Sequence, residues 1–277
     1  MSDNIAGKSV VITGGASGFG RLTAERLAAQ GAKLTLADIN ASAVEEVAAA
    51  ICAAGGEAHA VTADVTSMED MHRVASAAIG AFGAIDVMVN NAGIMPLAFI
   101  ADHKSALPAW ERCIDINFRG VMHGSVAVYD QMMAQGRGHI VNLSSIYGNR
   151  PTAGAAVYGA TKAAVDYFSH ALRQEARGKI KVTVIKPTGI MATGLMDTVV
   201  NPAAGAGLVG HNVATFYEDF GKFKSDDPGS LADPDAVGCA FLTPDHIAEA
   251  IVHVVNQPWG VSISDITVRA SGEHYIA

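Results

Sequence analysis

Short apolar and β-branched runs alternate with stretches of helical periodicity along nearly the whole chain. Strands are expected at seven of these runs, 9–13, 33–38, 57–65, 85–90, 139–143, 181–185 and 263–268. Helices are expected between them, most clearly at 68–82, 108–133, 158–177 and 247–255. Strands separated by single helices form βαβ units, which require a parallel sheet with helices on both faces. The pattern predicts a single α/β domain over 1–277, built on a doubly wound parallel sheet of about seven strands.

One long segment interrupts this alternation. Residues 188–243 are rich in glycine and proline and show no sustained periodicity. A loop of that length inside a compact domain is usually a lid or a binding element and not a simple connection. We therefore expect 188–243 to be an irregular substrate lid within the single domain.

Charge and cysteine content exclude several classes of protein. The chain has 19 Lys and Arg against 27 Asp and Glu, a net charge of −8, and no basic stripe, so nucleic acid is not an expected partner. Cys52, Cys113 and Cys239 lack CxxC spacing, so neither a metal site nor a disulfide framework is expected. The uncharged stretch 198–217 is too rich in glycine and polar residues for a membrane helix, and residues 1–15 contain no apolar signal region. We expect a soluble cytoplasmic protein.

The first expected strand ends in a glycine-rich turn that leads directly into a helix. In the sequence TGGASGFG, residues 13–20, Gly14, Gly18 and Gly20 carry no side chain. Backbone N–H groups and a helix N-terminus can therefore approach a pyrophosphate closely. Because strand, turn and helix occur in the order that a dinucleotide site requires, the turn predicts phosphate binding, with a purely structural turn as the alternative.

Asp38 ends the second expected strand and points to a particular cofactor. A carboxylate at this place can accept hydrogen bonds from the hydroxyls of an adenosine ribose and would repel a 2′-phosphate. The glycine turn contains no Lys or Arg, and none directly follows Asp38. The position favours NAD(H) over NADP(H), and the alternative interpretation is a solvated Asp at a strand end.

Tyr158 and Lys162 stand four residues apart at the start of an expected helix, so their side chains share one face. A phenol with a pKa of about 10 is a poor base near neutrality, and lowering that pKa to about 7 needs about 4 kcal/mol. One cation about 4 Å away supplies about 4 kcal/mol at an effective dielectric of about 20. A partly desolvated pair could therefore act as an acid and base, whereas the bare spacing is also common on exposed helices.

These motifs occur in a fixed order with three others. Asn90-Asn91-Ala92-Gly93 follows the fourth expected strand, Asn117 lies in IDINFRG, and Ser144-Ser145 follows the fifth expected strand. The set resembles the short-chain dehydrogenase/reductase family, in its short-form, NAD-preferring branch. The motifs cover residues 10–190, and the order of the expected strands and helices extends the resemblance to residue 277. The resemblance implies a Rossmann-type fold and an oxidoreductase.

The same resemblance implies roles for the residues of the motifs. Tyr158 is similar to the family's catalytic acid and base, and Lys162 to the partner that lowers its pKa and holds the nicotinamide ribose. Ser145, 13 residues before Tyr158, corresponds to the contact with the substrate oxygen, whereas Ser144 is expected to be structural. Asn117 resembles the residue that holds a water linking Lys162 to solvent.

The cofactor contacts implied by the resemblance run along the chain from the glycine turn to the end of the sixth expected strand. Asp64 would reach the adenine amino group. The alternative role for Asp64 is that of a carboxylate in the N-cap region of the next helix. The full set of implied cofactor residues is Gly14, Ser17, Gly18, Phe19, Gly20, Asp38, Ile39, Asp64, Val65, Asn91, Ala92, Gly93, Tyr158, Lys162, Pro187 and Ile190.

One motif departs from the family pattern. After the sixth expected strand the family usually reads Pro-Gly-x-x-x-Thr, whereas this chain reads Pro187-Thr188-Gly189 and places Thr193 one position late. The departure puts the threonine contact to the cofactor in doubt, because Ala192 can occupy that place.

The function implied is hydride transfer between NAD(H) and a secondary alcohol or ketone, with no metal. Six residues at strand ends and in the lid suggest an apolar or aromatic small-molecule substrate, or else they are ordinary packing residues: Met95, Tyr147, Met191, Met196, Phe216 and Tyr217.

The helices 108–133 and 158–177 resemble those at the interface of family homotetramers. The alternatives are an NADPH-dependent 3-oxoacyl-type reductase, a non-catalytic NAD-binding regulator, and an extended-branch epimerase or dehydratase.

Overall fold

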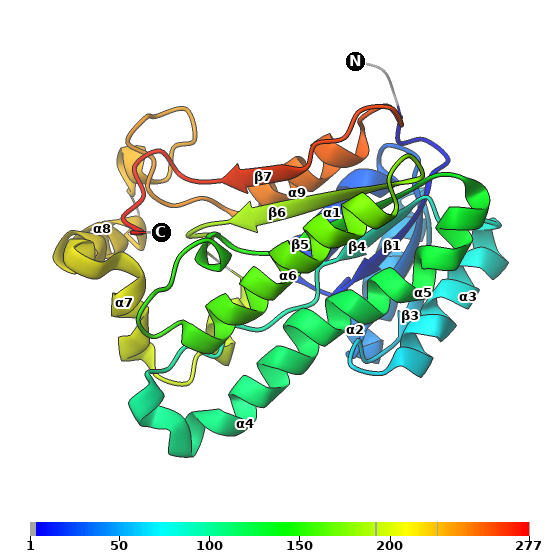
Figure 1. The fold of residues 1–277 in the computed structure, drawn as a ribbon. Coiled ribbons are helices and arrows are strands. Elements are labelled where there is room, and N and C mark those ends of the chain that lie inside the picture. The colour runs from blue at the N-terminus through cyan, green and yellow to red at the C-terminus, as the bar shows by residue number, and fades with distance from the viewer. Residues whose placement is uncertain (1–3, 192, 226, 277) are drawn as a thin grey trace.

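Seven parallel strands form one sheet in the computed structural model, which describes residues 4–191, 193–225 and 227–276 (Figure 1). The strand order is β3-β2-β1-β4-β5-β6-β7, so the chain reverses its direction of winding between β1 and β4. The strands are β1 Ser9–Thr13, β2 Lys33–Asp38, β3 Glu57–Thr62, β4 Val87–Asn90, β5 Gly138–Leu143, β6 Ile180–Pro187 and β7 Asp265–Val268. Ligands of such sheets bind beyond the carboxyl ends of the strands, beside this reversal.

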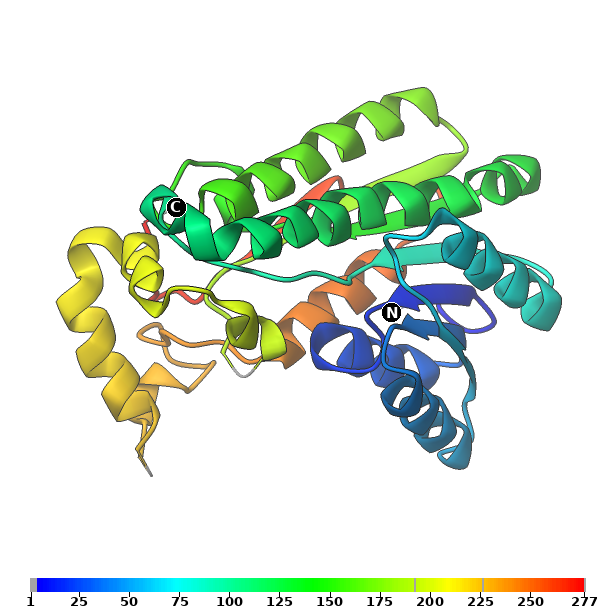
Figure 2. The ribbon, with the colours of Figure 1, turned by 90° about the horizontal axis from the view of Figure 1, so that it is seen from below.

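Helices cover both faces of the sheet, as Figure 2 shows. One layer contains α1, α2 and α9, and the other contains α3 to α6. The helices are α1 Gly18–Ala28, α2 Ala41–Ala53, α3 Met68–Phe82, α4 His103–Ile114, α5 Gly120–Gln135, α6 Ala156–Glu175, α7 Gly205–Val209, α8 Val213–Phe223 and α9 Pro244–Val255. No helix in the described ranges is long and apolar enough to cross a membrane.

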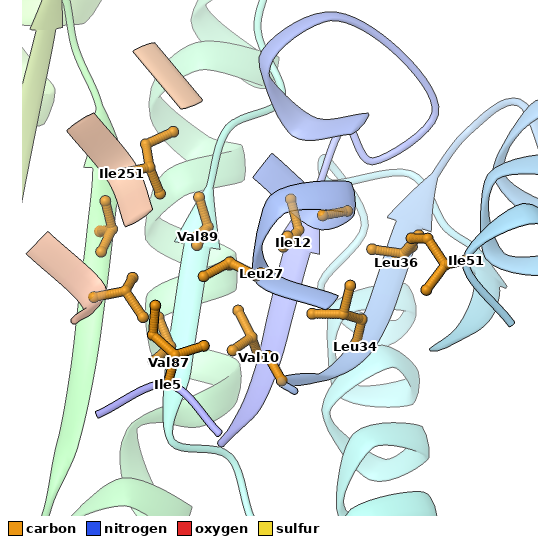
Figure 3. Close-up of a cluster of buried hydrophobic side chains, with 14 of the residues drawn as sticks. Ile5, Val10, Ile12, Leu27, Leu34, Leu36, Ile51, Val87, Val89 and Ile251 are labelled. Carbon is orange, nitrogen blue, oxygen red and sulfur yellow. The ribbon is translucent and has the colours of Figure 1, made fainter. Parts of the chain in front are cut away.

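The hydrophobic core forms because both faces of each central strand are covered. Val10 and Ile12 of β1 pack with Leu27 of α1 and Ile251 of α9, and all four are fully buried (Figure 3). Between them Val11 faces the opposite layer and is also fully buried. The predicted doubly wound parallel sheet in a single α/β domain is therefore confirmed.

The structure differs from the sequence-based expectations in two segments. The helix expected at 108–133 is α4 and α5, joined by a π-helical turn at Asp115–Arg119, with Pro108 inside α4. The expectation of an irregular segment at 188–243 is wrong for its middle, which carries α7, α8 and several short 3₁₀ turns. Phe216, Phe220 and Phe223 have helical spacing and lie on one side of α8. This spacing does not stand out in the sequence because the segment is rich in glycine.

Candidate active site

A cavity of about 1020 Å³ opens at the carboxyl ends of the central strands, beside the β1–β4 reversal. Its walls come from the glycine turn, the segments after β2 to β6, helix α4, helices α7 and α8, here called the lid helices, and the C-terminal tail. Sixteen residues predicted from the sequence line it: Gly14, Ser17, Gly18, Phe19, Asp38, Ile39, Asp64, Val65, Asn91, Ala92, Gly93, Ser145, Tyr158, Lys162, Pro187 and Ile190. The structure thus brings together all the predicted site residues except Gly20 and Asn117, which lie behind the cavity wall.

The glycine turn provides an open helix N-terminus at one end of the cavity. Ser17 is the N-cap of α1, but its side chain makes no capping hydrogen bond, and the first turn carries no acidic residue. At Gly18, a Cβ would meet no atom within 4 Å, so a ligand can approach the backbone there. At Gly20, a Cβ would overlap the carbonyl of Gly14, so the turn can close only on glycine. These features fit a bound pyrophosphate, because N–H groups and the helix dipole favour an anion.

Two carboxylates lie farther along this end of the cavity. Asp38 accepts hydrogen bonds from the backbone N–H of Ala16 at 3.1 Å and of Asn40 at 3.0 Å, which orient its carboxylate beside the glycine turn. Asp64 accepts hydrogen bonds from the backbone N–H and the hydroxyl of Thr66, at 2.9 and 2.8 Å, and these bonds stabilise the turn before α3. Asp64 also lines the cavity. In the described chain, the cavity residues numbered 14–66 include no Lys or Arg.

Ser145, Tyr158 and Lys162 meet at the other end of the cavity. Ser145 follows β5, whereas Tyr158 and Lys162 lie in the first two turns of α6, and all three are almost fully buried. The Lys162 Nζ lies 5.8 Å from the Tyr158 ring centroid and donates a hydrogen bond to the Leu143 carbonyl at 2.8 Å. The Ser145 hydroxyl accepts a hydrogen bond from the Tyr147 N–H at 3.3 Å and lies beside the Tyr158 hydroxyl. A serine, a phenol and a cation therefore face a common space.

Burial dominates the electrostatics of this group. Burial disfavours the phenolate and raises the pKa of Tyr158 to about 12, although the hydrogen bond with Ser145 opposes the shift. Burial likewise disfavours the ammonium and lowers the pKa of Lys162 to about 8. The expected lowering of the Tyr158 pKa by Lys162 is therefore not found in the protein alone. The phenol is a proton donor at neutral pH.

Asn117 is fully buried in the π-helical turn between α4 and α5 and does not line the cavity. Its amide pairs with the backbone of Ile94, donating to the carbonyl and accepting from the N–H, each at 2.9 Å. It also donates to Cys113 Sγ and Thr161 Oγ1, both at 3.3 Å. The side chain thus holds the segment after β4 in place, where Gly93 faces Lys162. A π turn inside a long helix frequently marks a functional site.

A buried amide pair aligns the two central strands that carry the site. Asn90 of β4 and Asn142 of β5 are register partners, and the Asn90 Nδ2 donates to the Asn142 Oδ1 at 2.8 Å. The Asn142 Nδ2 in turn donates to the Ser169 hydroxyl of α6 at 2.8 Å. The Ser144 hydroxyl donates to the Lys162 carbonyl at 3.1 Å. These bonds connect β4, β5 and α6, so the residues that follow the strands reach the cavity together.

The segment after β6 runs beside the C-terminal part of the lid. Thr188 is buried, and its N–H donates to the Val268 carbonyl at 3.1 Å. The Met191 N–H donates to the Leu242 carbonyl at 3.0 Å, and Thr193 lines the cavity. Ala192, which the sequence comparison with the family pattern singled out, lies outside the described residues.

The substrate end of the cavity is apolar and aromatic. All six residues suggested from the sequence line it, namely Met95, Tyr147, Met191, Met196, Phe216 and Tyr217. Sequence reasoning missed several other lining residues, among them Leu208, Val209, Phe220 and Tyr275. The four-residue spacing from Phe216 could have identified Phe220, whereas no local pattern marks Tyr275.

Comparisons with known proteins agree with this geometry. The family model of short chain dehydrogenases matches residues 8–203. The uncharacterized oxidoreductase Lmo0432 of Listeria monocytogenes serovar 1/2a is 34% identical over 272 residues, 97% of this chain and 98% of that protein. A 7α-hydroxysteroid dehydrogenase complexed with NADH and 7-oxo glycochenodeoxycholic acid superposes with a TM-score of 0.80 at 26% identity, covering 100% of this chain and 99% of that one. A metagenomic short-chain oxidoreductase in complex with NADP gives 0.72 at 25% identity, covering 96% and 98%.

Proposed function

The chain belongs to the short-chain dehydrogenase/reductase family, and on that premise we propose that it transfers a hydride between NAD(H) and a secondary alcohol or its ketone. The observation that carries the proposal is the arrangement of one cavity. Its first end offers the backbone of the glycine turn, and its second end offers Ser145, Tyr158 and Lys162. A dinucleotide held at the first end can extend to the second.

In the proposed reaction, Ser145 and Tyr158 act on the substrate oxygen. During reduction their hydroxyl groups donate hydrogen bonds to the ketone, and Tyr158 gives up its proton as negative charge develops on that oxygen. During oxidation Tyr158 accepts the proton of the alcohol, and the nearby Lys162 ammonium stabilises the phenolate. When bound, the nicotinamide supplies or accepts the hydride at the adjacent carbon.

Asp38 supports NAD over NADP in the proposed function. Its carboxylate lies beside the glycine turn, where the ribose of the adenosine would be, and a 2′-phosphate would meet negative charge. The N–H groups at the start of α1 would hold the pyrophosphate, and Asp64 and Val65 would border the adenine. Because solved relatives hold both NADH and NADP, an NADPH-dependent reductase is the alternative that the assay must test.

The substrate in the proposed function is an apolar or aromatic alcohol or ketone. Methionine and aromatic side chains line the cavity beyond Tyr158, so binding is favoured by burial of hydrocarbon surface.

The direct test is a panel of secondary alcohols and ketones, assayed with each of the two cofactors in both directions by the absorbance of the reduced nicotinamide. We expect turnover of cyclic or aromatic members and a lower KM for NAD(H). Absence of turnover with every substrate would refute hydride transfer, and a lower KM for NADP(H) would refute the role of Asp38.

A further inference from the structure

The C-terminal tail, residues 272–276, folds back onto the lid helices at the substrate end of the cavity (Figure 1). The Ile276 N–H donates to the Leu208 carbonyl of α7 at 3.2 Å. Asn212 donates to the His274 carbonyl at 2.9 Å, and the His274 Nε2 lies 3.0 Å from the Asp219 carboxylate of α8. The tail is thus held along both lid helices, with Tyr275 between these attachment points.

The Tyr275 ring lies against the backbone of Gly189, in the segment after β6. A Cβ on Gly189 would overlap the Tyr275 Cε2 and would lie 2.9 Å from its Cδ2. Gly189 also has a φ of +60°, a left-handed conformation that favours glycine. The family pattern usually has its glycine one position earlier, where this chain has Thr188. In this chain the glycine is at 189, where its lack of a side chain leaves space for the Tyr275 ring.

Tyr275 also connects the site to the lid. Its ring centroid lies 6.4 Å from that of Tyr147, with an edge-on geometry, and Tyr147 is two residues after Ser145. On its other side, the centroid of Phe216 of α8 lies 6.0 Å away, again edge-on. All three rings line the cavity. Tyr275 therefore lies between the residues that face the substrate oxygen and the lid.

We propose that Tyr275 is a specificity-determining residue whose ring closes the substrate end and limits the size of the ring system that enters. This inference rests on the proposed hydride transfer and assigns its substrates to compact ring alcohols and ketones. Gly189 is a positioning residue, because it admits the ring.

The first experiment compares the reduction of cyclohexanone and of 2-decalone, which has a second fused ring. In Tyr275→Ala, the ratio of kcat/KM for 2-decalone to that for cyclohexanone should rise about tenfold or more, because removal of the ring opens space for the extra carbons. Tyr275→Phe keeps the ring and should keep the ratio. Tyr167→Ala removes a tyrosine that is 79% exposed on α6 and serves as the control. An unchanged ratio in Tyr275→Ala would overturn the proposal.

The second experiment tests the contact of Gly189 and Tyr275 without turnover. Gly189→Ala, Tyr275→Ala and the double variant form a thermal-unfolding cycle. Gly189→Ala should lower Tm less in the Tyr275→Ala background, because the overlap with the ring is gone although the backbone strain stays. Additive changes in Tm would overturn the assignment of Gly189. If wild type reduces neither ketone, the substrate panel decides the proposed function. Binding of the two ketones to wild type and Tyr275→Ala, measured calorimetrically, then decides the role of Tyr275.

Discussion

Replacing Tyr158 by Phe removes one hydroxyl group from the centre of the candidate site. The ring stays, so its packing around the cavity is retained, and only the hydroxyl beside Ser145 is lost. Because the pKa of Tyr158 is raised to about 12, the phenol carries its proton at neutral pH and is ready to donate it to a ketone. Loss of a positioned acid or base typically slows a reaction about 10²- to 10⁴-fold, or about 3–5 kcal/mol of transition-state stabilisation.

The assay separates chemistry from binding. We expect Tyr158→Phe to lower kcat for ketone reduction by at least about 100-fold, while a fluorescence titration gives an NADH affinity close to that of wild type. Tyr167→Phe makes the same chemical change nine residues along α6, at a side chain that is 79% exposed, and should leave kcat unchanged. A variant that keeps more than about a tenth of the wild-type kcat would refute the assignment of Tyr158 as the proton donor.

Four further predictions follow from the geometry. Asp38→Ala should raise the KM for NAD severalfold in steady-state kinetics, and an unchanged value would contradict the ribose contact. Alcohol oxidation requires Tyr158 to lose its proton, and burial raises its pKa, so kcat/KM for oxidation should rise between about pH 7 and 10; a flat profile would count against this. Asn117→Ala should lower the free energy of unfolding by about 2 kcal/mol or more in urea, because both backbone groups of Ile94 lose their partner. Light scattering should give a tetramer mass, since Leu107 and Ile114 of α4 and Val126 of α5 are exposed; a monomer mass would exclude it.

Much of the fold follows from local pattern. The central strands are buried on both faces, so they read as continuous apolar runs, and the strand at Ser9–Thr13 has the bounds that the sequence predicts. The two glycines Gly18 and Gly20 could be interpreted from sequence because their task is local, namely to turn the chain into α1. The residues of the candidate site could be recognised by their order along the chain, and the structure brings Ser145, Tyr158 and Lys162 together.

The missed features depend on contacts between distant segments. Tyr275 reaches the cavity only because the tail folds onto α7 and α8, and nothing in the neighbouring sequence encodes that path. The amide of Asn117 contacts the backbone of Ile94, Cys113 and Thr161, partners that the sequence around it does not reveal. Burial raises the pKa of Tyr158 to about 12, and spacing on a helix reveals a neighbouring cation but not the depth of burial.

The amide pair of Asn90 and Asn142 has a consequence for how the sheet assembles. Strands made almost wholly of apolar residues can slide by two positions and still present the same faces to the core. Such a slide of β5 along β4 would separate the two amides. The Asn142 amide would lose its partner, at about 1–3 kcal/mol, whereas Asn90 would keep its bond to Ser125 of α5. The pair therefore penalises misaligned chains during folding. Two polar side chains inside the sheet therefore favour one register of β4 and β5. In this register Gly93 and Ser145 line the same cavity.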